Sequence, residues 1–177
     1  MKKTMLEGKE IRLRPLEPSD LDVLMKWEND PFNWGVTNTF IPFSKHSLKL
    51  YIETIKDIYT DKQYRFVIER KSDRQPLGFI DLFEFDAFHH RAGIGILLGE
   101  SNERRKGYAA ESLEVLLNYA REILALKSLF CNILVSNEAS VKLFEGKGFV
   151  RSGLKKEWFR KGNQWEDEYF YQYHFNS

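Results

Sequence analysis

Three consecutive cations followed by a glycine stand at the start of a helix-like pattern. Arg104, Arg105 and Lys106 precede Gly107, and apolar residues then recur at the spacing of an amphipathic helix. The first N–H groups of a helix are unpaired and its N-terminus is partly positive, so cations there are unfavourable unless an anion binds. Glycine lets the backbone approach a ligand closely. The stretch indicates a site for pyrophosphate or a phosphorylated ribose, with a solvated basic turn as the alternative for an isolated RRKG.

Two other phosphate-binding patterns do not fit this chain. The P-loop pattern GxxxxGK(S/T) is absent from the sequence. The segment "GIGILLG" at residues 93–99 has glycines spaced GxGxxxG, with Ile and Leu between them. Such a run is typical of a strand and not of a strand-to-helix turn, so it is not a dinucleotide fingerprint.

A second motif lies at residues 137–149, "NEASVKLFEGKGF", after an apolar β-like run. With the first motif, it resembles the GNAT superfamily of N-acetyltransferases. Arg104, Gly107 and Ala109 match the acetyl-CoA loop (Q/R)xxGx(G/A) of that superfamily. The chain is similar to the branch of spermidine N-acetyltransferases and ribosomal-protein N-terminal acetyltransferases over about residues 11–175. The later signature, roughly Nxx(A/S)xxL(Y/F)xxxGF, is matched by Asn137, Ser140, Leu143, Phe144, Gly148 and Phe149.

The resemblance implies that acetyl-CoA lies in a V-shaped gap between two parallel strands, "AGIGILLG" and "SLFCNILV". Backbone groups at 96–98 would pair with the pantetheine arm, N–H groups at 105–110 would hold the pyrophosphate, and Asn137 would lie near the thioester. The implied cofactor-binding residues are Ile96, Leu97, Leu98, Arg104, Arg105, Lys106, Gly107, Tyr108, Ala109, Ala110, Asn137, Ser140 and Phe144.

The implied chemistry is direct transfer of an acetyl group to an amine, with a backbone N–H stabilising the oxyanion. A primary amine, with a pKa of about 10, must lose a proton before it attacks, and the departing thiolate must regain one. Many relatives use a tyrosine for the second task where this chain has Phe144. Another group, a water or unassisted departure would replace it, with Ser140 and Tyr108 as candidate donors.

Candidates for the base are Asp81 and Glu84, which interrupt the apolar segment "GFIDLFEFD". Carboxylates are costly in such a strand unless they are paired or functional. Strand alternation predicts opposite faces for the two, so that at most one reaches the gap. The alternative is that one faces solvent and the other pairs with a cation.

The acceptor is expected between residues 29–44 and the last hairpin. Acidic residues there would attract a cationic amine and aromatic rings would line its path, whereas core aromatics and a solvated hairpin are the alternative. The resemblance favours a small primary amine such as the polyamine spermidine. A protein α-amino group is the alternative acceptor, and a non-catalytic acyl-CoA-binding module is the alternative class. The candidate residues are Asp30, Trp34, Phe40, Trp165 and Glu166.

The elements that must position these residues follow from hydrophobic periodicity. Strands are predicted at 11–16, 63–70, 76–85, 92–99, 128–135, 149–159 and 164–175. Helices are predicted within 17–30, after a Ser44 cap, at 107–125 and within 137–148, while 31–44 is expected to be irregular. This order predicts an α/β (α+β) fold of one domain, 1–177. The resemblance implies a mixed, mostly antiparallel sheet of about seven strands, splayed between two parallel strands, with helices on both faces.

Composition limits the remaining possibilities. The 177 residues carry a formal net charge of +1, which argues against a general nucleic-acid binder. Cys131 is the only cysteine, which excludes an intramolecular disulfide and fits a reducing, cytoplasmic setting. We expect no signal peptide, no membrane span and no metal site, since His89–His90 has no third ligand nearby in sequence. The long aromatic last strand suggests a homo-oligomer.

Overall fold

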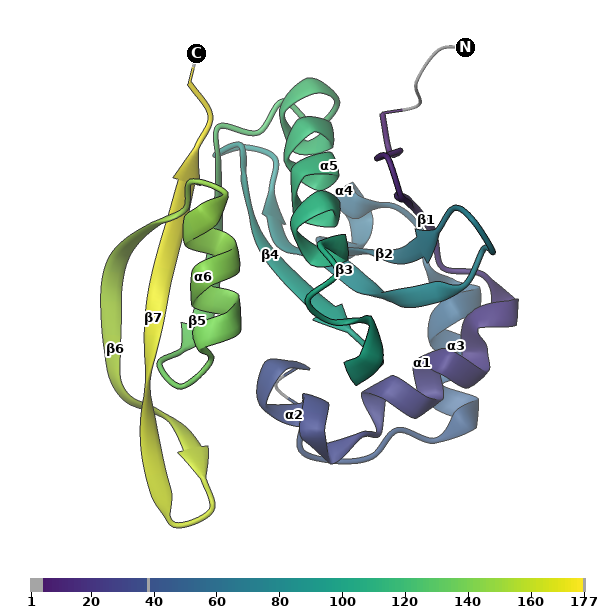
Figure 1. Ribbon diagram of the computed structural model, residues 1–177, viewed down its shortest axis with the longest axis horizontal. Coiled ribbons are helices and arrows are strands. Elements are labelled where there is room, and N and C mark those ends of the chain that lie inside the picture. Colours follow the sequence, from purple (N-terminus) through teal and green to yellow (C-terminus); the bar gives the residue numbers. More distant parts are fainter. Residues whose placement is uncertain (1–4, 38, 177) are drawn as a thin grey trace.

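A computed structural model describes residues 5–37 and 39–176 of the chain (Figure 1). A seven-stranded sheet runs through these residues in the order β1-β2-β3-β4-β5-β7-β6. Every neighbouring pair is antiparallel except β4 and β5, which are parallel. The predicted mixed, mostly antiparallel sheet is confirmed. Its strands are β1 (Ile11–Pro15), β2 (Tyr64–Arg70), β3 (Pro76–Asp86), β4 (Arg91–Leu98), β5 (Ser128–Leu134), β6 (Val150–Lys161) and β7 (Gln164–His174).

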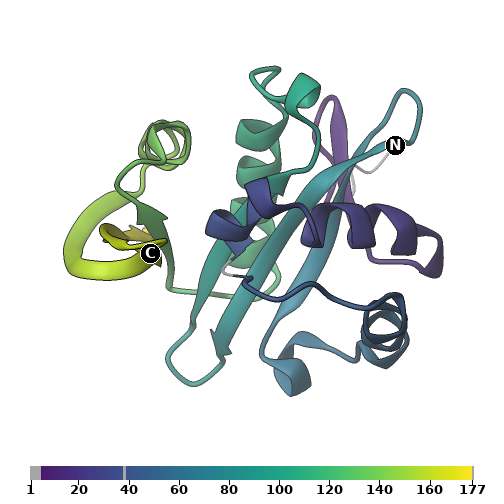
Figure 2. The same cartoon turned by 90° about the horizontal axis from the view of Figure 1, so that it is seen from below.

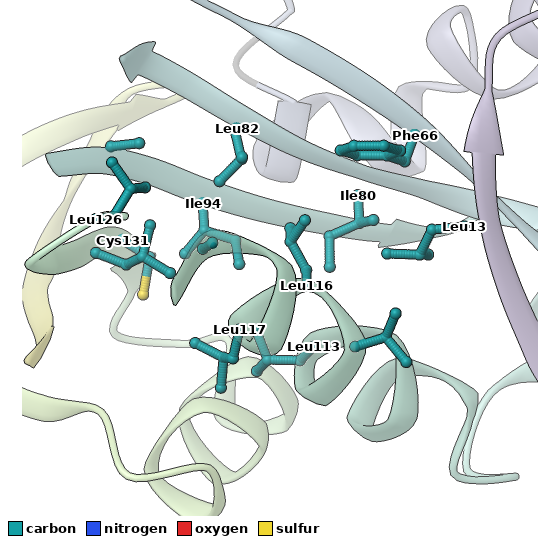
Figure 3. Packing of buried hydrophobic residues seen from close by; sticks show 14 of the residues in the cluster. Leu13, Phe66, Ile80, Leu82, Ile94, Leu113, Leu116, Leu117, Leu126 and Cys131 are labelled. Carbon is teal, nitrogen blue, oxygen red and sulfur yellow. The ribbon is translucent and has the colours of Figure 1, made fainter. Parts of the chain in front are cut away.

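Helices cover both faces of the sheet (Figure 2). On one face, Leu113 and Leu116 of α5 join a core with Ile80 and Ile94 (Figure 3). On the other face, Trp27 and its neighbours in α1 and α3 form a smaller core with β2 and β3. The helices are α1 (Leu21–Glu28), α2 (Pro31–Thr37), α3 (Lys45–Thr54), α4 (Ile58–Asp61), α5 (Tyr108–Glu122) and α6 (Glu138–Gly146), with 3-10 turns η1 (Pro18–Asp20) and η2 (Ser101–Glu103).

Two short helices differ from the sequence prediction. The segment after residue 30 was expected to be irregular, but it forms α2, and α4 was not expected. Asp30 starts α2 by accepting the Phe32 N–H at 2.9 Å, and the Trp34 indole donates to the Glu28 carbonyl at 3.0 Å. Asp57 caps α4 by accepting two backbone N–H groups. Caps and tertiary contacts therefore form both helices without a long periodic pattern.

The two parallel strands diverge after a short paired region. Only Arg91 to Gly93 of β4 pair with β5, opposite Ser128 to Phe130. A side chain at the last pair would displace the Phe83 ring, because a Cβ on Gly93 would lie 2.2 Å from it. Beyond this pair the strands separate, as Figure 1 shows between β4 and β5. The splay that the resemblance implied is confirmed.

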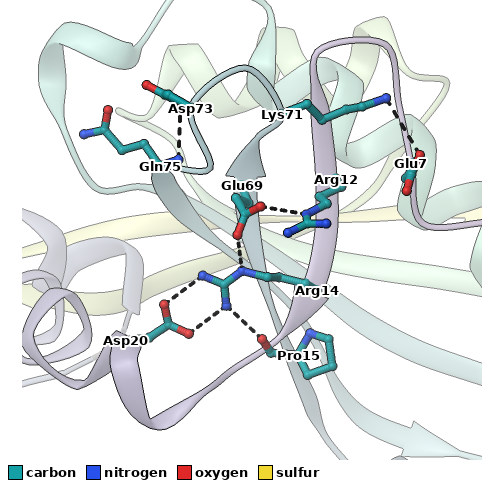
Figure 4. A network of polar contacts seen from close by, with 9 residues as sticks. All are labelled: Glu7, Arg12, Arg14, Pro15, Asp20, Glu69, Lys71, Asp73 and Gln75. Carbon is teal, nitrogen blue, oxygen red and sulfur yellow. Dashed lines mark hydrogen bonds and ion pairs between the residues drawn. The ribbon is translucent and has the colours of Figure 1, made fainter.

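A network of buried charges joins the first strand to the first helices (Figure 4). The Arg14 guanidinium donates to both carboxylate oxygens of Asp20, at 2.7 and 2.8 Å, and also to Glu69. Glu69 accepts from Arg12 as well, at 2.6 Å. Hydrogen bonds to Asp20 and Glu69 raise the pKa of Arg14 against the opposing effect of burial. These contacts fix η1, and therefore the start of α1, against β1 and β2.

Candidate active site

A cavity of about 850 Å³ lies where β4 and β5 diverge. Residues of β3, β4 and β5 line it, together with the start of α6, the C-terminal part of α2 and the hairpin of β6 and β7. The part beside α6 contains the motif that begins at Asn137. Another part of the cavity lies between α2 and the hairpin of β6 and β7. The cavity is thus built from segments distant in the sequence.

Gly107 begins α5 with a left-handed backbone, φ 86°. A Cβ at this glycine would meet no atom within 4 Å, so the space in front of the helix is open. The first intrahelical N–H donor is Glu111, which bonds to the Gly107 carbonyl at 3.0 Å. The N–H groups of Tyr108, Ala109 and Ala110 therefore precede the helical hydrogen-bond ladder and point out of the helix end. This geometry suits a phosphate group.

The three cations before Gly107 have different environments. Arg104 donates to the Leu98 carbonyl at 3.2 Å and lies over the Phe32 ring at 4.9 Å. Lys106 forms a 3.1 Å ion pair with Glu103. Arg105 is exposed, and within residues 5–37 and 39–176 it has no side-chain partner. Arg105 is thus the cation most available to an incoming anion.

The splayed edge of β4 could hold an amide-containing chain. Ile96 and Leu97 line the cavity, and past Gly93 no strand among the described residues pairs with β4 on its β5 side. Backbone groups at such an edge are free to pair with an extended ligand. The pantetheine arm of CoA contains two amides, so the edge and the open end of α5 together fit CoA. No ligand is needed to explain the fold itself.

The later motif faces the same cavity from α6. Asn137 caps this helix by accepting the Ser140 N–H at 3.2 Å, and both residues line the cavity. Phe144 also lines it and packs edge-on against Phe149, with ring centroids 5.0 Å apart. The motif singled out from the sequence thus lines the cavity, and its roles in binding stay predictions.

Acidic groups on the cavity wall differ in how they are held. Arg65 donates to both oxygens of Asp81, at 2.9 and 2.7 Å, and also to the buried Glu28. Burial opposes the charge of Arg65, but the two carboxylates outweigh this effect and raise its pKa. Both oxygens of Asp81 are thus occupied by the guanidinium. The two oxygens have about four lone-pair sites in total, so Asp81 can still accept a hydrogen bond from an ammonium group while it pairs with Arg65.

Glu84 reaches the same cavity because β3 contains a bulge. The pairing of β3 with β4 shifts between Phe83 and Asp86, and Glu84 adopts φ 46°. An extra residue changes the face on which the following side chains lie. The prediction that Asp81 and Glu84 lie on opposite faces is therefore wrong: both line the cavity. Glu84 is exposed and accepts no hydrogen bond from the described residues.

The predicted acceptor residues divide into two groups. Phe40 and Trp165 line the cavity. Asp30 starts α2, Trp34 bonds to the Glu28 carbonyl, and Glu166 accepts the Ser136 N–H at 2.7 Å. These last three lie outside the cavity lining and hold its surrounding loops in place.

Several cavity residues were not singled out from the sequence. They are Lys155, Asn132 and Arg160. Lys155 donates to Asn132 at 2.7 Å and to Glu168, which also lines the cavity, at 3.1 Å. Finding them requires knowing that β7 lies between β5 and β6. Arg65 was also missed, although it lies directly opposite Asp81 in the β2–β3 pairing.

Acids near the cavity hold their protons tightly. Burial raises the pKa of the Cys131 thiol, which lines the cavity, to about 12. Burial and the neighbouring Glu145 raise the pKa of Tyr171 to about 12, and its hydroxyl donates to Glu145 at 2.8 Å. Neither group releases a proton readily near neutral pH.

The profile of the Acetyltransferase (GNAT) domain family matches residues 10–150, most of the chain. The chain belongs to this family. It is therefore an acetyl-CoA-dependent acyltransferase, and the family assignment favours an enzyme over a non-catalytic binding module. No helix within the described residues is long and apolar enough to cross a membrane. No group of three His, Cys, Asp or Glu side chains in the same residues could hold a metal ion.

Relatives of this acetyltransferase include characterised and uncharacterised proteins. A spermidine N(1)-acetyltransferase from Vibrio cholerae is 31% identical over 108 residues, 60% of this chain and 61% of that protein. An uncharacterised N-acetyltransferase, p20, from Bacillus licheniformis is 29% identical over 91% of this chain and 90% of its own length.

Solved structures share the fold of this acetyltransferase. The spermidine N-acetyltransferase of Vibrio cholerae, in complex with CoA and spermine, superposes with a TM-score of 0.84 at 24% identity. The superposition covers 94% of this chain and 96% of that one. At this identity the likeness concerns the fold.

Proposed function

We propose that this protein transfers the acetyl group of acetyl-CoA directly to the primary amine of a small molecule. The observation that carries the proposal is the cavity at the β4–β5 splay, which has carboxylates on its wall and extends to Leu97. The next residue, Leu98, accepts a hydrogen bond from Arg104, shortly before the anion-suited helix start at Gly107. Acetyl-CoA would supply an activated acyl group. The remaining tasks, which are binding, orientation and proton removal, belong to the chain's own residues.

The cofactor would lie along the edge of β4 and end at α5. Backbone groups at Ile96 and Leu97 would pair with the amides of the pantetheine arm. The N–H groups after Gly107, with the Arg105 guanidinium, would bind the pyrophosphate. Asn137, Ser140 and the Phe144 ring would enclose the thioester end.

Glu84 is proposed as the base that takes a proton from the amine. Its carboxylate is unpaired among the described residues, whereas both oxygens of Asp81 bind Arg65. Asp81 would instead orient the ammonium form of the acceptor before proton loss. The bulge at Glu84 makes this division possible, since it brings both carboxylates to one cavity.

Polyamines such as spermidine are candidate acceptors, supported by the relative that carries that activity in its name. A protein α-amino group is a second candidate. It is favoured by exposed apolar side chains that line the cavity, Phe40, Trp158 and Trp165. The single cysteine supports a cytoplasmic setting, and the unpaired outer edge of β6 supports a homo-oligomer.

The test is release of free CoA thiol from acetyl-CoA with a panel of polyamines, amino acids and N-terminal peptides. We expect release with at least one acceptor class and tight binding of CoA by calorimetry. Glu84→Gln should lower kcat by about 10²-fold or more and flatten its rise with pH. Asp81→Asn should mainly raise KM. Equal kcat losses in both variants, with unchanged pH profiles, would contradict this assignment of roles.

A further inference from the structure

The walls of the cavity carry opposite charge. The acidic wall consists of Asp81 and Glu84 of β3. Arg65 lines the cavity beside them and pairs with Asp81 and with Glu28 outside the lining, so the carboxylates outnumber the guanidinium on this side. The opposite wall, from β6 and β7, carries Lys155, Arg160 and Glu168. Two cations there face one carboxylate. A ligand that spans the cavity meets a negative side and a positive side.

Both cations of the positive wall have donors to spare. Lys155 Nζ uses two of its three N–H groups on Asn132 and Glu168. Its side chain is 31% exposed, and it lies 5.3 Å from the centre of the Trp158 ring. Arg160 bonds only through Nε, to the Gly162 carbonyl at 3.0 Å. Its four remaining N–H groups have no partner among the described residues.

Aromatic rings lie beside these cations. Phe40 and Phe159 pack with ring centroids 5.9 Å apart, and Trp158 and Trp165 remain largely exposed. All four residues line the cavity. An apolar acceptor body would cover these rings, while a second amine in the same place would meet Lys155 and Arg160.

From this polarity we infer that the preferred acceptor is an amine that also carries a carboxylate on an apolar body, as aromatic amino acids do. The inference rests on the proposed function and narrows its acceptor class. The ammonium group binds at Asp81 and Glu84, and the carboxylate accepts hydrogen bonds from Arg160 and the free N–H of Lys155. Polyamines, which have no anionic group, are poorer acceptors in this cavity.

The test compares kcat/KM for L-phenylalanine, 2-phenylethylamine and spermidine. The first two differ by one carboxylate. Their ratio is measured in the wild type, in Arg160→Gln and in the control Arg151→Gln, an arginine of the same strand outside the cavity lining. Comparing ratios between proteins cancels the intrinsic reactivity of each amine. Lys155→Gln provides a second variant, with its melting temperature recorded.

We expect L-phenylalanine to be the best of the three acceptors. The ratio should fall about ten- to hundredfold in Arg160→Gln, the effect of losing a charged hydrogen bond, and stay constant in Arg151→Gln. Turnover of 2-phenylethylamine should be unchanged in the control Arg151→Gln. A preference for spermidine, or an unchanged ratio in Arg160→Gln, overturns the inference and leaves the proposed function intact. No thiol release with any amine, despite CoA binding, overturns the proposed function and this inference together.

Discussion

Replacing Arg14 with methionine should destabilise the fold strongly, because one guanidinium holds two buried carboxylates. The side chains of Asp20 and Glu69 are each only 4% exposed. Without Arg14, the one hydrogen bond that Asp20 keeps within the described residues comes from the Glu17 N–H, at 2.8 Å. Breaking a buried pair by removing one partner costs about 3–5 kcal/mol. For a chain of this length, that free energy lowers the melting temperature by about 6–20 °C.

The measurement is urea and thermal unfolding of the wild type, Arg14→Met and the control Arg12→Met. Arg12 is 38% exposed, and Glu69 would keep Arg14 after its loss, so the control should lose about 1 kcal/mol or less. The reasoning is refuted if Arg14→Met loses under 1 kcal/mol or if both variants lose the same amount. Because this network positions α1, we also expect a higher KM for the acceptor in Arg14→Met, measured at temperatures where the variant remains folded.

Three further outcomes are expected. Gly107→Val should weaken CoA binding, measured by calorimetry, at least tenfold. The control is Gly162→Val, because Gly162 also has open surroundings and a positive φ, and this variant should bind CoA normally. Equal CoA affinities of the two variants would place the pyrophosphate elsewhere. Phe144→Tyr should raise kcat and add a descending limb to the pH profile of kcat near pH 10. Phe149→Tyr, at a residue outside the cavity lining, should do neither. An unchanged kcat in Phe144→Tyr would mean that departure of the thiolate needs no acid. The folded pKa of Cys131, about 12, exceeds the unfolded value of about 8.5, so its contribution to the free energy of unfolding is complete below pH 8.5 and is lost as pH rises towards 12. Urea unfolding between pH 8.5 and 10.5 should therefore show a steeper loss in the wild type than in Cys131→Ala, by up to about 1.4 kcal/mol per pH unit, and parallel curves would contradict the shift.

The elements that sequence analysis predicted well depend on local chemistry. Ser44 caps α3 by accepting the Ser47 N–H at 3.0 Å. In the apolar stripe predicted for 107–125, Leu113, Leu116, Leu117 and Ala120 are buried, whereas Ile123 is exposed. The ion pair between Arg65 and Asp81 across the β2–β3 hairpin was not predicted. Counting outward from the predicted turn at 71–75 places Arg65 opposite Asp81. The observed pairing agrees there only because the register shifts between Ile68 and Glu69, and the sequence does not mark that shift.

Other features depend on information that periodicity does not contain. A bulge at Glu84 reverses which face its carboxylate takes, and nothing in "GFIDLFEFD" marks the extra residue. Lys155 meets Asn132 and Glu168 only because the last strand inserts between β5 and β6. Long-range strand order therefore decides the positive wall, and a single sequence does not specify it.

The β6–β7 hairpin extends beyond the strand that supports it. Pairing of β7 with β5 ends at Glu168, opposite Leu134, so the pairs from Phe159 to Gln164 have no third strand. A two-stranded ribbon is marginally stable, and its amides should exchange with solvent deuterium far faster than those of β5. Because Arg160 and Trp165 lie on this ribbon, an acceptor that binds them would slow that exchange. Deuterium uptake at the tip would then report acceptor binding in the absence of any turnover.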